Sequence, residues 1–218
     1  MGLGNPGPRY AGSPHNVGFR VVDHFADHHL GAGRAVWSRR FDAELTTLSL
    51  ADGHPNPSAL PIESEPIVLL KPLTFMNRSG ESVRKAMSFF KITVPDALIV
   101  HDELDLPFGS VKLKRGGGEA GHNGLKSVTA ELGTRDYARL RVGVGRPAEG
   151  EVSDYLLAPM PGARATELEQ NLEDVRDAID LWLVHGLEQA MNRVNRKVAR
   201  EQKAPPATSG GPEAGQSD

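Results

Sequence analysis

Four short motifs carry the side chains of this chain that are suited to acid–base chemistry. Each lies beside an expected turn, and together they occupy residues 4–7 with His15-Asn16, 75–77, 101–105 and 121–124. Histidine can take up a proton near neutral pH, aspartate can orient an imidazole, and asparagine amides can donate or accept hydrogen bonds. These residue types predict a polar site in which a base, an orienting carboxylate and several neutral donors meet around one substrate.

His15 is the candidate base. The apolar spacing that follows it predicts a helix, and His15 stands at the start of that helix. A helix N-terminus favours the neutral imidazole, which can accept a proton from water or a hydroxyl group. A capping or exposed histidine is the structural alternative, because the chain contains eight histidines.

The acidic motif His101-Asp102-Glu103-Leu104-Asp105 follows a short apolar run. It therefore lies at the carboxyl end of an expected strand, where α/β proteins place their sites. Three carboxylates could bind Mg²⁺. One aspartate could instead hold a histidine by its second nitrogen. A charged turn without a chemical role is the third interpretation.

The opening residues Gly2-Leu3-Gly4-Asn5-Pro6-Gly7 fit the dinucleotide-binding pattern G-x-G-x-x-G, with Asp23 as a candidate ribose ligand. That pattern requires a strand before the glycines and a helix that begins at them. Here only Met1 precedes the glycines, and two prolines delay the helix. A turn that presents the Asn5 amide explains the motif better.

Two further motifs lie just ahead of expected helices. Asn77 could cap its helix or act in the site. The glycine-dense stretch 116–124 can approach a phosphate closely, and Lys114, Arg115 and Lys126 flank it. This stretch is interpreted as an anion-facing edge, with a flexible loop before a capped helix as the alternative.

The charge distribution indicates where an anionic ligand could bind. The net charge is −3, but residues 110–146 contain only three acidic residues against eight basic ones: Lys112, Lys114, Arg115, Lys126, Arg135, Arg139, Arg141 and Arg146. This segment is therefore +5 and the rest of the chain −8. A local basic patch fits a polyanion, although solvated strand and helix faces explain these charges equally well.

The composition excludes several classes of protein. The chain contains no cysteine, which removes disulfides, thiolate nucleophiles and cysteine-ligated zinc. No apolar run approaches the ~20 residues of a membrane span, and the first residues lack the features of a secretion signal. A cytoplasmic protein is expected.

Alternating strand and helix patterns position the motifs. Helices are expected over residues 15–30, 79–91, 122–132 and 162–200, the last with a break at Gly186, and strands over 44–50, 66–70, 97–100, 111–114 and 140–144. Residues 51–65 are expected to form a long loop. The pattern predicts an α/β fold, a single-domain three-layer sandwich with a mixed, mostly parallel twisted sheet flanked by helices. The catalytic domain is expected to span residues 1–200, and residues 201–218 a disordered tail.

The available residues favour hydrolysis by activated water. The chain has no G-x-S-x-G elbow, no cysteine and no Walker lysine. A histidine base, an orienting aspartate, amide donors and a basic rim remain. This set suits the attack of water on an activated acyl ester of a polyanion, such as an ester at the 3′ end of an RNA.

The four motifs, in this order and spacing, closely resemble those of the bacterial peptidyl-tRNA hydrolases, and the resemblance covers about residues 2–193. It implies a monomeric, metal-independent cytoplasmic esterase without a cofactor, which cleaves peptide from tRNA after premature release from the ribosome. In the family's pattern His15 matches the base that activates water. Asp102 matches the aspartate that holds this histidine in its basic form, and Asn5 the residue that separates peptidyl from aminoacyl ends.

The resemblance also implies substrate contacts. Four positions match residues that contact tRNA and peptide: Tyr10, Phe75, Asn77 and Asn123. Lys114 and Arg141 match basic positions that meet tRNA phosphate. Asn77 is the expected oxyanion donor, because its amide can donate a hydrogen bond. The expected partner is peptidyl-tRNA, with no metal and no membrane.

Three features depart from the family's pattern. The hydrophobic strand that normally leads into the first motif is missing, so either the start of the chain is assigned too late or the sheet lacks a strand. In the second case, backbone partners in the sheet would be unpaired. Pro14 replaces a usually basic residue, which would weaken an RNA contact. Ala120 replaces a usual glycine, at a cost of roughly 1 kcal/mol if its φ is positive.

A binding protein on the same fold, like the organellar splicing factors related to this family, is the competing function. Such a protein could keep the basic face without turnover. It has no need of the full polar set, which this chain retains: Asn5, His15, Asn77, Asp102 and Asn123.

Overall fold

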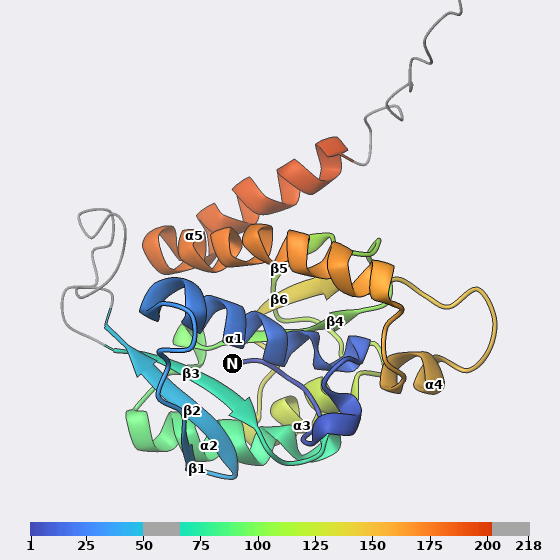
Figure 1. The fold of residues 1–218 in the computed structure, drawn as a ribbon. Helices are drawn as coiled ribbons and strands as arrows, with labels where there is room; N and C mark the ends of the chain where they lie inside the picture. Colours follow the sequence, from blue (N-terminus) through green and yellow to red (C-terminus); the bar gives the residue numbers. More distant parts are fainter. Residues whose placement is uncertain (50–65, 202–218) are drawn as a thin grey trace, which may run out of the picture.

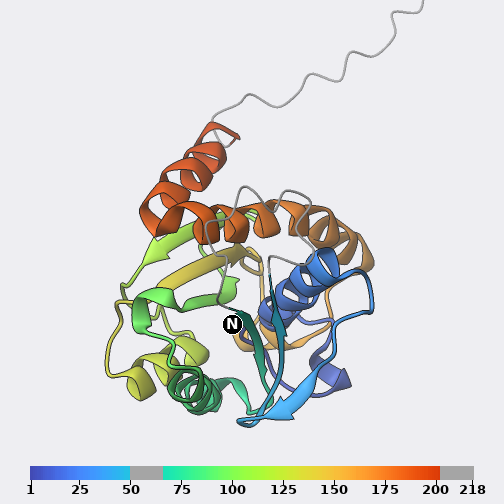
Figure 2. The same ribbon diagram turned by 90° about the vertical axis from the view of Figure 1, so that its left-hand side faces the viewer.

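The structure is a computed structural model that describes residues 1–49 and 66–201, with side chains to residue 196. Its middle layer consists of two three-stranded sheets, ordered β1-β2-β3 and β4-β6-β5 (Figures 1 and 2). Their bounds are β1 Ser38–Arg40, β2 Ala43–Leu48, β3 Ile67–Pro72, β4 Leu98–Glu103, β5 Val111–Arg115 and β6 Ala138–Gly143.

The first three residues of the chain join the two sheets. Gly2 N–H donates to Leu70 O on β3, while Leu3 N–H donates to Val100 O and Val100 N–H donates to Met1 O, each at 2.9 Å. The opening segment thus runs parallel to β4, between it and β3. The strand position beside β4 is therefore occupied in part, because these three residues pair with backbone groups of Leu70 and Val100.

The mixed sheet is confirmed, but its pairing is less parallel than expected. Among the strands of the described residues, β4 and β6 pair in parallel, whereas β1–β2, β2–β3 and β5–β6 pair antiparallel. For β1 and β2 the cause is their two-residue connection, which permits only antiparallel pairing.

Helices cover both faces of the middle layer, which confirms the three-layer α/β sandwich (Figure 1). Helices α1 (Val17–Leu30) and α5 (Gly162–Glu201) share one core with Leu98 and Val100 of β4. Helices α2 (Ser79–Phe90) and α3 (Asn123–Leu132) share the other core with Ile99. Successive residues of β4 thus point to opposite faces, as a strand buried on both sides requires.

The expected elements agree with the observed ones to within a few residues. The predicted break in the last helix is confirmed, since Gly186 has φ 74° and ψ 171°. The sequence patterns missed β1 and the short helix α4 (Val152–Leu157), and they ended the strand before His101, whereas β4 continues through Glu103. The predicted loop at 51–65 and nearly all of the tail lie outside the described residues.

Glycines allow α1 to approach the opening segment closely. A Cβ on Gly2 would lie 2.0 Å from Gly18 O, and one on Gly18 would lie 2.4 Å from Leu3 N. The glycine-rich start therefore serves helix packing. The dinucleotide interpretation is wrong, because α1 begins only at Val17, well beyond the glycines. The described residues include no helix long and apolar enough to span a bilayer.

Candidate active site

A cleft of about 710 Å³ opens at the carboxyl ends of β4 and β6. All nine residues that the sequence singled out line it: Asn5, Tyr10, His15, Phe75, Asn77, Asp102, Lys114, Asn123 and Arg141. They come from six separate parts of the chain. The edge of the sheet brings these parts together, which is where a crevice is expected in an open α/β sheet.

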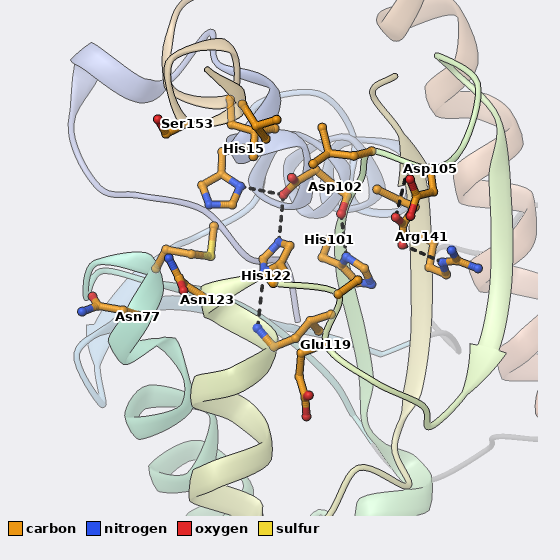
Figure 3. A pocket seen from close by; sticks show the side chains of 18 of the residues that line it. His15, Asn77, His101, Asp102, Asp105, Glu119, His122, Asn123, Arg141 and Ser153 are labelled. Carbon is orange, nitrogen blue, oxygen red and sulfur yellow. Dashed lines mark hydrogen bonds and ion pairs between the residues drawn. The ribbon is translucent and has the colours of Figure 1, made fainter. Parts of the chain in front are cut away.

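His15 and Asp102 form a buried pair at the centre of this cleft (Figure 3). His15 lies in a 3₁₀ turn (Pro14–Asn16) that leads into α1, and the fixed φ of Pro14 suits the first position of that turn. His15 Nδ1 lies 2.8 Å from Asp102 Oδ1. An ionised carboxylate accepts only, so Nδ1 carries the proton and Nε2 is the basic nitrogen.

His122 binds the same carboxylate oxygen, at 3.0 Å from its Nε2. Its Nδ1 accepts the backbone N–H groups of Gly124 and Leu125 and so caps α3. Because Nδ1 accepts, Nε2 must carry the proton and donate to Asp102. The start of α3 therefore fixes the tautomer of His122, and through it the orientation of the Asp102 carboxylate.

Asp102 remains ionised although it is buried. Burial alone raises its pKa, but the adjacent His122 and His15 rings outweigh this effect and hold the pKa well below its usual value. An ionised Asp102 can stabilise the positive charge that forms on His15 when it takes up a proton.

His101 is the third ring of this cluster and packs edge-on against His122, with 5.1 Å between the ring centroids. Its Nδ1 donates to the backbone carbonyl of Asp102 at 2.7 Å. Burial, aided by the neighbouring His122, lowers the pKa of His101 to about 3. A neutral His101 thus supports the backbone beside the Asp102 carboxylate.

We expect His101 to make the fold sensitive to mild acid. Between pH 6.5 and about 3 the unfolded chain binds a proton at this residue that the folded chain does not. The contribution of the neutral His101 to the free energy of unfolding is therefore complete above pH 6.5 and decreases as the pH falls. Lowering the pH from 7.5 to 5.5 should decrease the free energy of unfolding by about 1.4 kcal/mol through His101. Urea unfolding of His101→Asn, which keeps the donor but cannot gain a proton, should show a correspondingly smaller loss. Equal losses in both proteins would contradict this assignment.

Asn5 is held rigidly by its neighbours. Its Oδ1 accepts the Met76 N–H at 2.8 Å. Its backbone N–H and C=O bind the Asn16 amide group, also at 2.8 Å. These contacts leave Nδ2 as the end of the Asn5 side chain available to a ligand in the cleft, although the chain bends only at Gly7. Asn16, next to the base, thus ties the two halves of the first motif together, and the bond from Met76 joins this motif to the second.

Asparagine and aromatic side chains form the rim of the cleft. Phe75 is 59% exposed, which is unusual for a large apolar side chain and fits a contact surface. Asn123 lies beside the His15 ring, whereas the Asn77 amide points away from it (Figure 3). Asn77 caps neither its own 3₁₀ turn (Met76–Arg78) nor α2. It would have to rotate toward His15 in order to stabilise an oxyanion.

The basic segment divides into paired and unpaired cations. Arg139 is 2% exposed and donates to the carbonyls of Gly117 and Gly118, so it holds the glycine loop instead of forming surface charge. Three other arginines contact carboxylates, in the pairs Arg135–Glu119, Arg141–Glu103 and Arg146–Asp105. Of the three cations expected along the glycine loop, only Lys114 lines the cleft.

The three carboxylates of the acidic motif do not converge on one point. Glu103 and Asp105 contact arginines, while Asp102 contacts the two histidines. The hypothesis that these three carboxylates share one Mg²⁺ ion is therefore wrong. Within residues 1–49 and 66–196, one group has metal-ligand spacing, namely His15, Asp102 and His122. It suits a metal poorly, because the cap on α3 keeps a proton on the His122 nitrogen that would have to bind the ion.

Comparison with known proteins identifies the family. Residues 1–203 match the family model described as peptidyl-tRNA hydrolase. The chain belongs to the peptidyl-tRNA hydrolase family. The peptidyl-tRNA hydrolase of Frankia casuarinae is 45% identical over 88% of this chain and 90% of its own length. That of Solidesulfovibrio magneticus is 44% identical over 89% and 90%.

Solved structures of the family show the same fold. The crystal structure of peptidyl-tRNA hydrolase from Acinetobacter baumannii is 35% identical and superposes with a TM-score of 0.75, covering 89% of this chain and 92% of the other. The expected membership of the peptidyl-tRNA hydrolase family and the expected fold class are thereby confirmed.

Two histidines in the site of this member of the peptidyl-tRNA hydrolase family, His122 and His101, were not predicted from the sequence. His122 was noted only as part of a glycine-flanked motif, yet it contacts Asp102 directly. The available signal was a histidine at the expected start of a helix, the same signal that identified His15. His101 escaped for a different reason, because nothing in the sequence shows which residue of an acidic motif turns inward.

Ala120 has φ 46°, so the strain expected from its departure from the family pattern is present. Ala120→Gly should therefore stabilise the fold by up to about 1 kcal/mol, since glycine adopts this conformation freely. Thermal unfolding should shift upward by roughly 2–4 °C. Ala130→Gly on the exposed side of α3 is the matched control and should shift it downward. A decrease in both variants would show that position 120 is not strained.

Proposed function

We propose that this protein hydrolyses the ester bond between the peptide and the tRNA of peptidyl-tRNA, with His15 as the base that activates water. The observation that carries the proposal is the buried pair between His15 Nδ1 and Asp102 Oδ1, which leaves the basic nitrogen of His15 inside the cleft. Membership of the peptidyl-tRNA hydrolase family supplies the substrate class.

The reaction uses one water molecule and one proton carrier. His15 Nε2 takes a proton from water as the water oxygen attacks the ester carbonyl carbon. The carbonyl oxygen becomes an oxyanion, to which the Asn123 or Asn77 amide donates. When the carbon–oxygen bond to the ribose breaks, His15 returns the proton to the leaving oxygen. The products are a peptide with a free carboxylate and a tRNA with a free hydroxyl group.

The rigid Asn5 amide explains how a peptidyl end can be told from an aminoacyl end. A peptidyl substrate offers a peptide carbonyl next to its last residue, whereas an aminoacyl end offers a charged ammonium group. The Asn5 Nδ2 group can donate to the carbonyl but repels the ammonium. Because Met76 N–H fixes the opposite end of the amide, Asn5 cannot turn its oxygen toward the ammonium without losing that hydrogen bond.

Lys114 is proposed as the main phosphate contact. It lines the cleft, and no carboxylate of the described residues forms an ion pair with it, whereas Arg141 already binds Glu103 at 2.9 Å. Lys114→Ala should weaken tRNA binding and reduce the slope of log Kd against log salt by about one unit. Lys126→Ala, a cation outside the cleft, is the control. An unaltered slope in Lys114→Ala would exclude this lysine from the contact.

The proposed function is tested by the release of peptide from purified peptidyl-tRNA, with unblocked aminoacyl-tRNA as the control substrate. We expect hydrolysis of the first and little of the second. A parallel reaction with EDTA tests the proposed independence from metal, since the activity should persist. Binding of the RNA without release of peptide would instead favour an RNA-binding protein on this fold. We further propose that the protein acts as a cytoplasmic monomer that recycles tRNA from peptides released early by the ribosome.

A further inference from the structure

A second cleft, of about 420 Å³, lies behind Asn5. Its walls come from the first loop, α1, β1, β2 and the residue after β3, and they include Gly7, Ala11, Arg39, Glu44 and Leu73. Asn5 lines both this cleft and the catalytic one. The mechanism described above makes no use of the second cleft.

The two clefts share their walls as well as Asn5. In the first loop, Tyr10 faces the catalytic cleft and Ala11 the second one. In the segment after β3, Phe75 faces the catalytic cleft and Leu73 the second one. The two walls that line the catalytic cleft therefore continue into the second cleft on either side of Asn5.

The order of the strands places the two clefts on opposite sides of the reacting bond. The basic residues Lys114 and Arg141 lie on β5 and β6, at one end of the middle layer. Asp102 lies on β4, in the centre. The second cleft lies over β1, β2 and the end of β3, at the other end. If tRNA occupies the basic end, the acyl group extends toward the second cleft.

The charges of the second cleft suit a polypeptide better than a nucleic acid. Its cations already face carboxylates, Arg39 with Glu44 at 3.3 Å and Arg20 with Glu169. Asp23, which also lines the cleft, contacts Lys71 at 2.5 Å. A surface with paired charges of both signs offers no attraction to a polyanion. It tolerates peptides of varied sequence, because it presents both donors and acceptors.

We propose that the second cleft binds the peptide part of the substrate, from the third residue before the ester onward. This inference rests on the proposed function, in which Asn5 contacts the first peptide bond. Residues further from the ester must then pass beyond Asn5, and the shared walls lead them into the second cleft. The enzyme should therefore bind long peptidyl-tRNAs more tightly than short ones.

The test compares two substrates, N-acetyl-aminoacyl-tRNA and a peptidyl-tRNA of about six residues. Ala11→Trp fills the second cleft from the first loop, and Arg39→Trp fills it from β1. Both variants should raise KM for the long substrate about tenfold, while kcat/KM for the short substrate stays near that of the unmodified protein. Ala130→Trp, exposed on α3, is the matched control and should change neither value.

The possible outcomes distinguish a failure of the peptide cleft from a failure of the proposed function. Equal kinetics of the unmodified protein and both tryptophan variants on the long substrate would overturn the peptide cleft, even though hydrolysis continued. Loss of activity on both substrates with an unchanged unfolding temperature would also overturn it, since the effect would then not depend on peptide length. Failure of the unmodified protein to cleave either substrate would instead contradict the proposed function.

Discussion

His15→Ala should abolish the release of peptide while the affinity for tRNA stays unchanged. The imidazole is held in the cleft by the ionised Asp102 carboxylate behind it, and its other nitrogen is free to accept a proton. General base catalysis contributes about 10²–10⁴ in rate, so kcat should decrease by at least that factor. The contacts proposed for tRNA phosphate lie on β5 and β6 and do not involve this side chain.

Single-turnover hydrolysis and filter binding measure the two quantities separately. His28→Ala is the matched control, because this histidine is exposed at the far end of the same helix, α1. We expect the control to keep its kcat. A His15→Ala protein with normal kcat would assign the base to another residue, and one with weakened tRNA binding alone would make His15 a substrate contact.

Asp102→Asn should lower kcat strongly without changing KM. The carboxylate receives a hydrogen bond from His15 and another from His122 on the same oxygen. Because the α3 cap keeps His122 Nε2 protonated, the new amide must turn its oxygen to the two rings. The His15 tautomer is then retained, and the decrease in kcat reports only the missing negative charge beside the imidazolium. A decrease of about 10²–10³ is expected, comparable to the loss of one oxyanion donor.

The double variant Asp102→Asn/His122→Ala tests this explanation. Without His122, the amide can rotate and present its NH₂ group to His15, which moves the proton to Nε2 and removes the base. We expect a further decrease in kcat beyond the product of the two single effects. Asp96→Asn, exposed just before β4, is the control and should keep full activity. If the decrease in kcat of the double variant equals the product of the two single decreases, His122 does not orient the amide.

The local sequence predicted most of the fold, because strand and helix periodicity depend on neighbouring residues. Helix α3 and strand β5 were expected within one residue of their observed bounds. The direction of strand pairing was less predictable, since it depends on which strands become neighbours. The start of the chain illustrates the same limit, because three residues too short to be recognised as a strand are held by partners around positions 70 and 100.

In the predicted basic patch, burial decides which positive charges are available to a ligand. Counting residues 110–146 treated Arg139 and Lys114 alike, but one is buried under the glycine loop and the other lines the cleft. The carboxylates that pair with Arg141 and Arg146 lie outside the counted segment. Net charge along a chain therefore located the basic region but not the cations available to phosphate.

The sequence by itself determined which residues are candidates for the base, its orienting aspartate and the asparagines, because the types of residue suited to this chemistry are few and each lies in a recognisable motif. Only the tertiary structure decided that His122 shares the Asp102 oxygen and that a second cleft continues behind Asn5. The physical reason is separation along the chain. Hydrogen-bond geometry, burial and the course of a groove arise between segments far apart in sequence, and no local pattern records them.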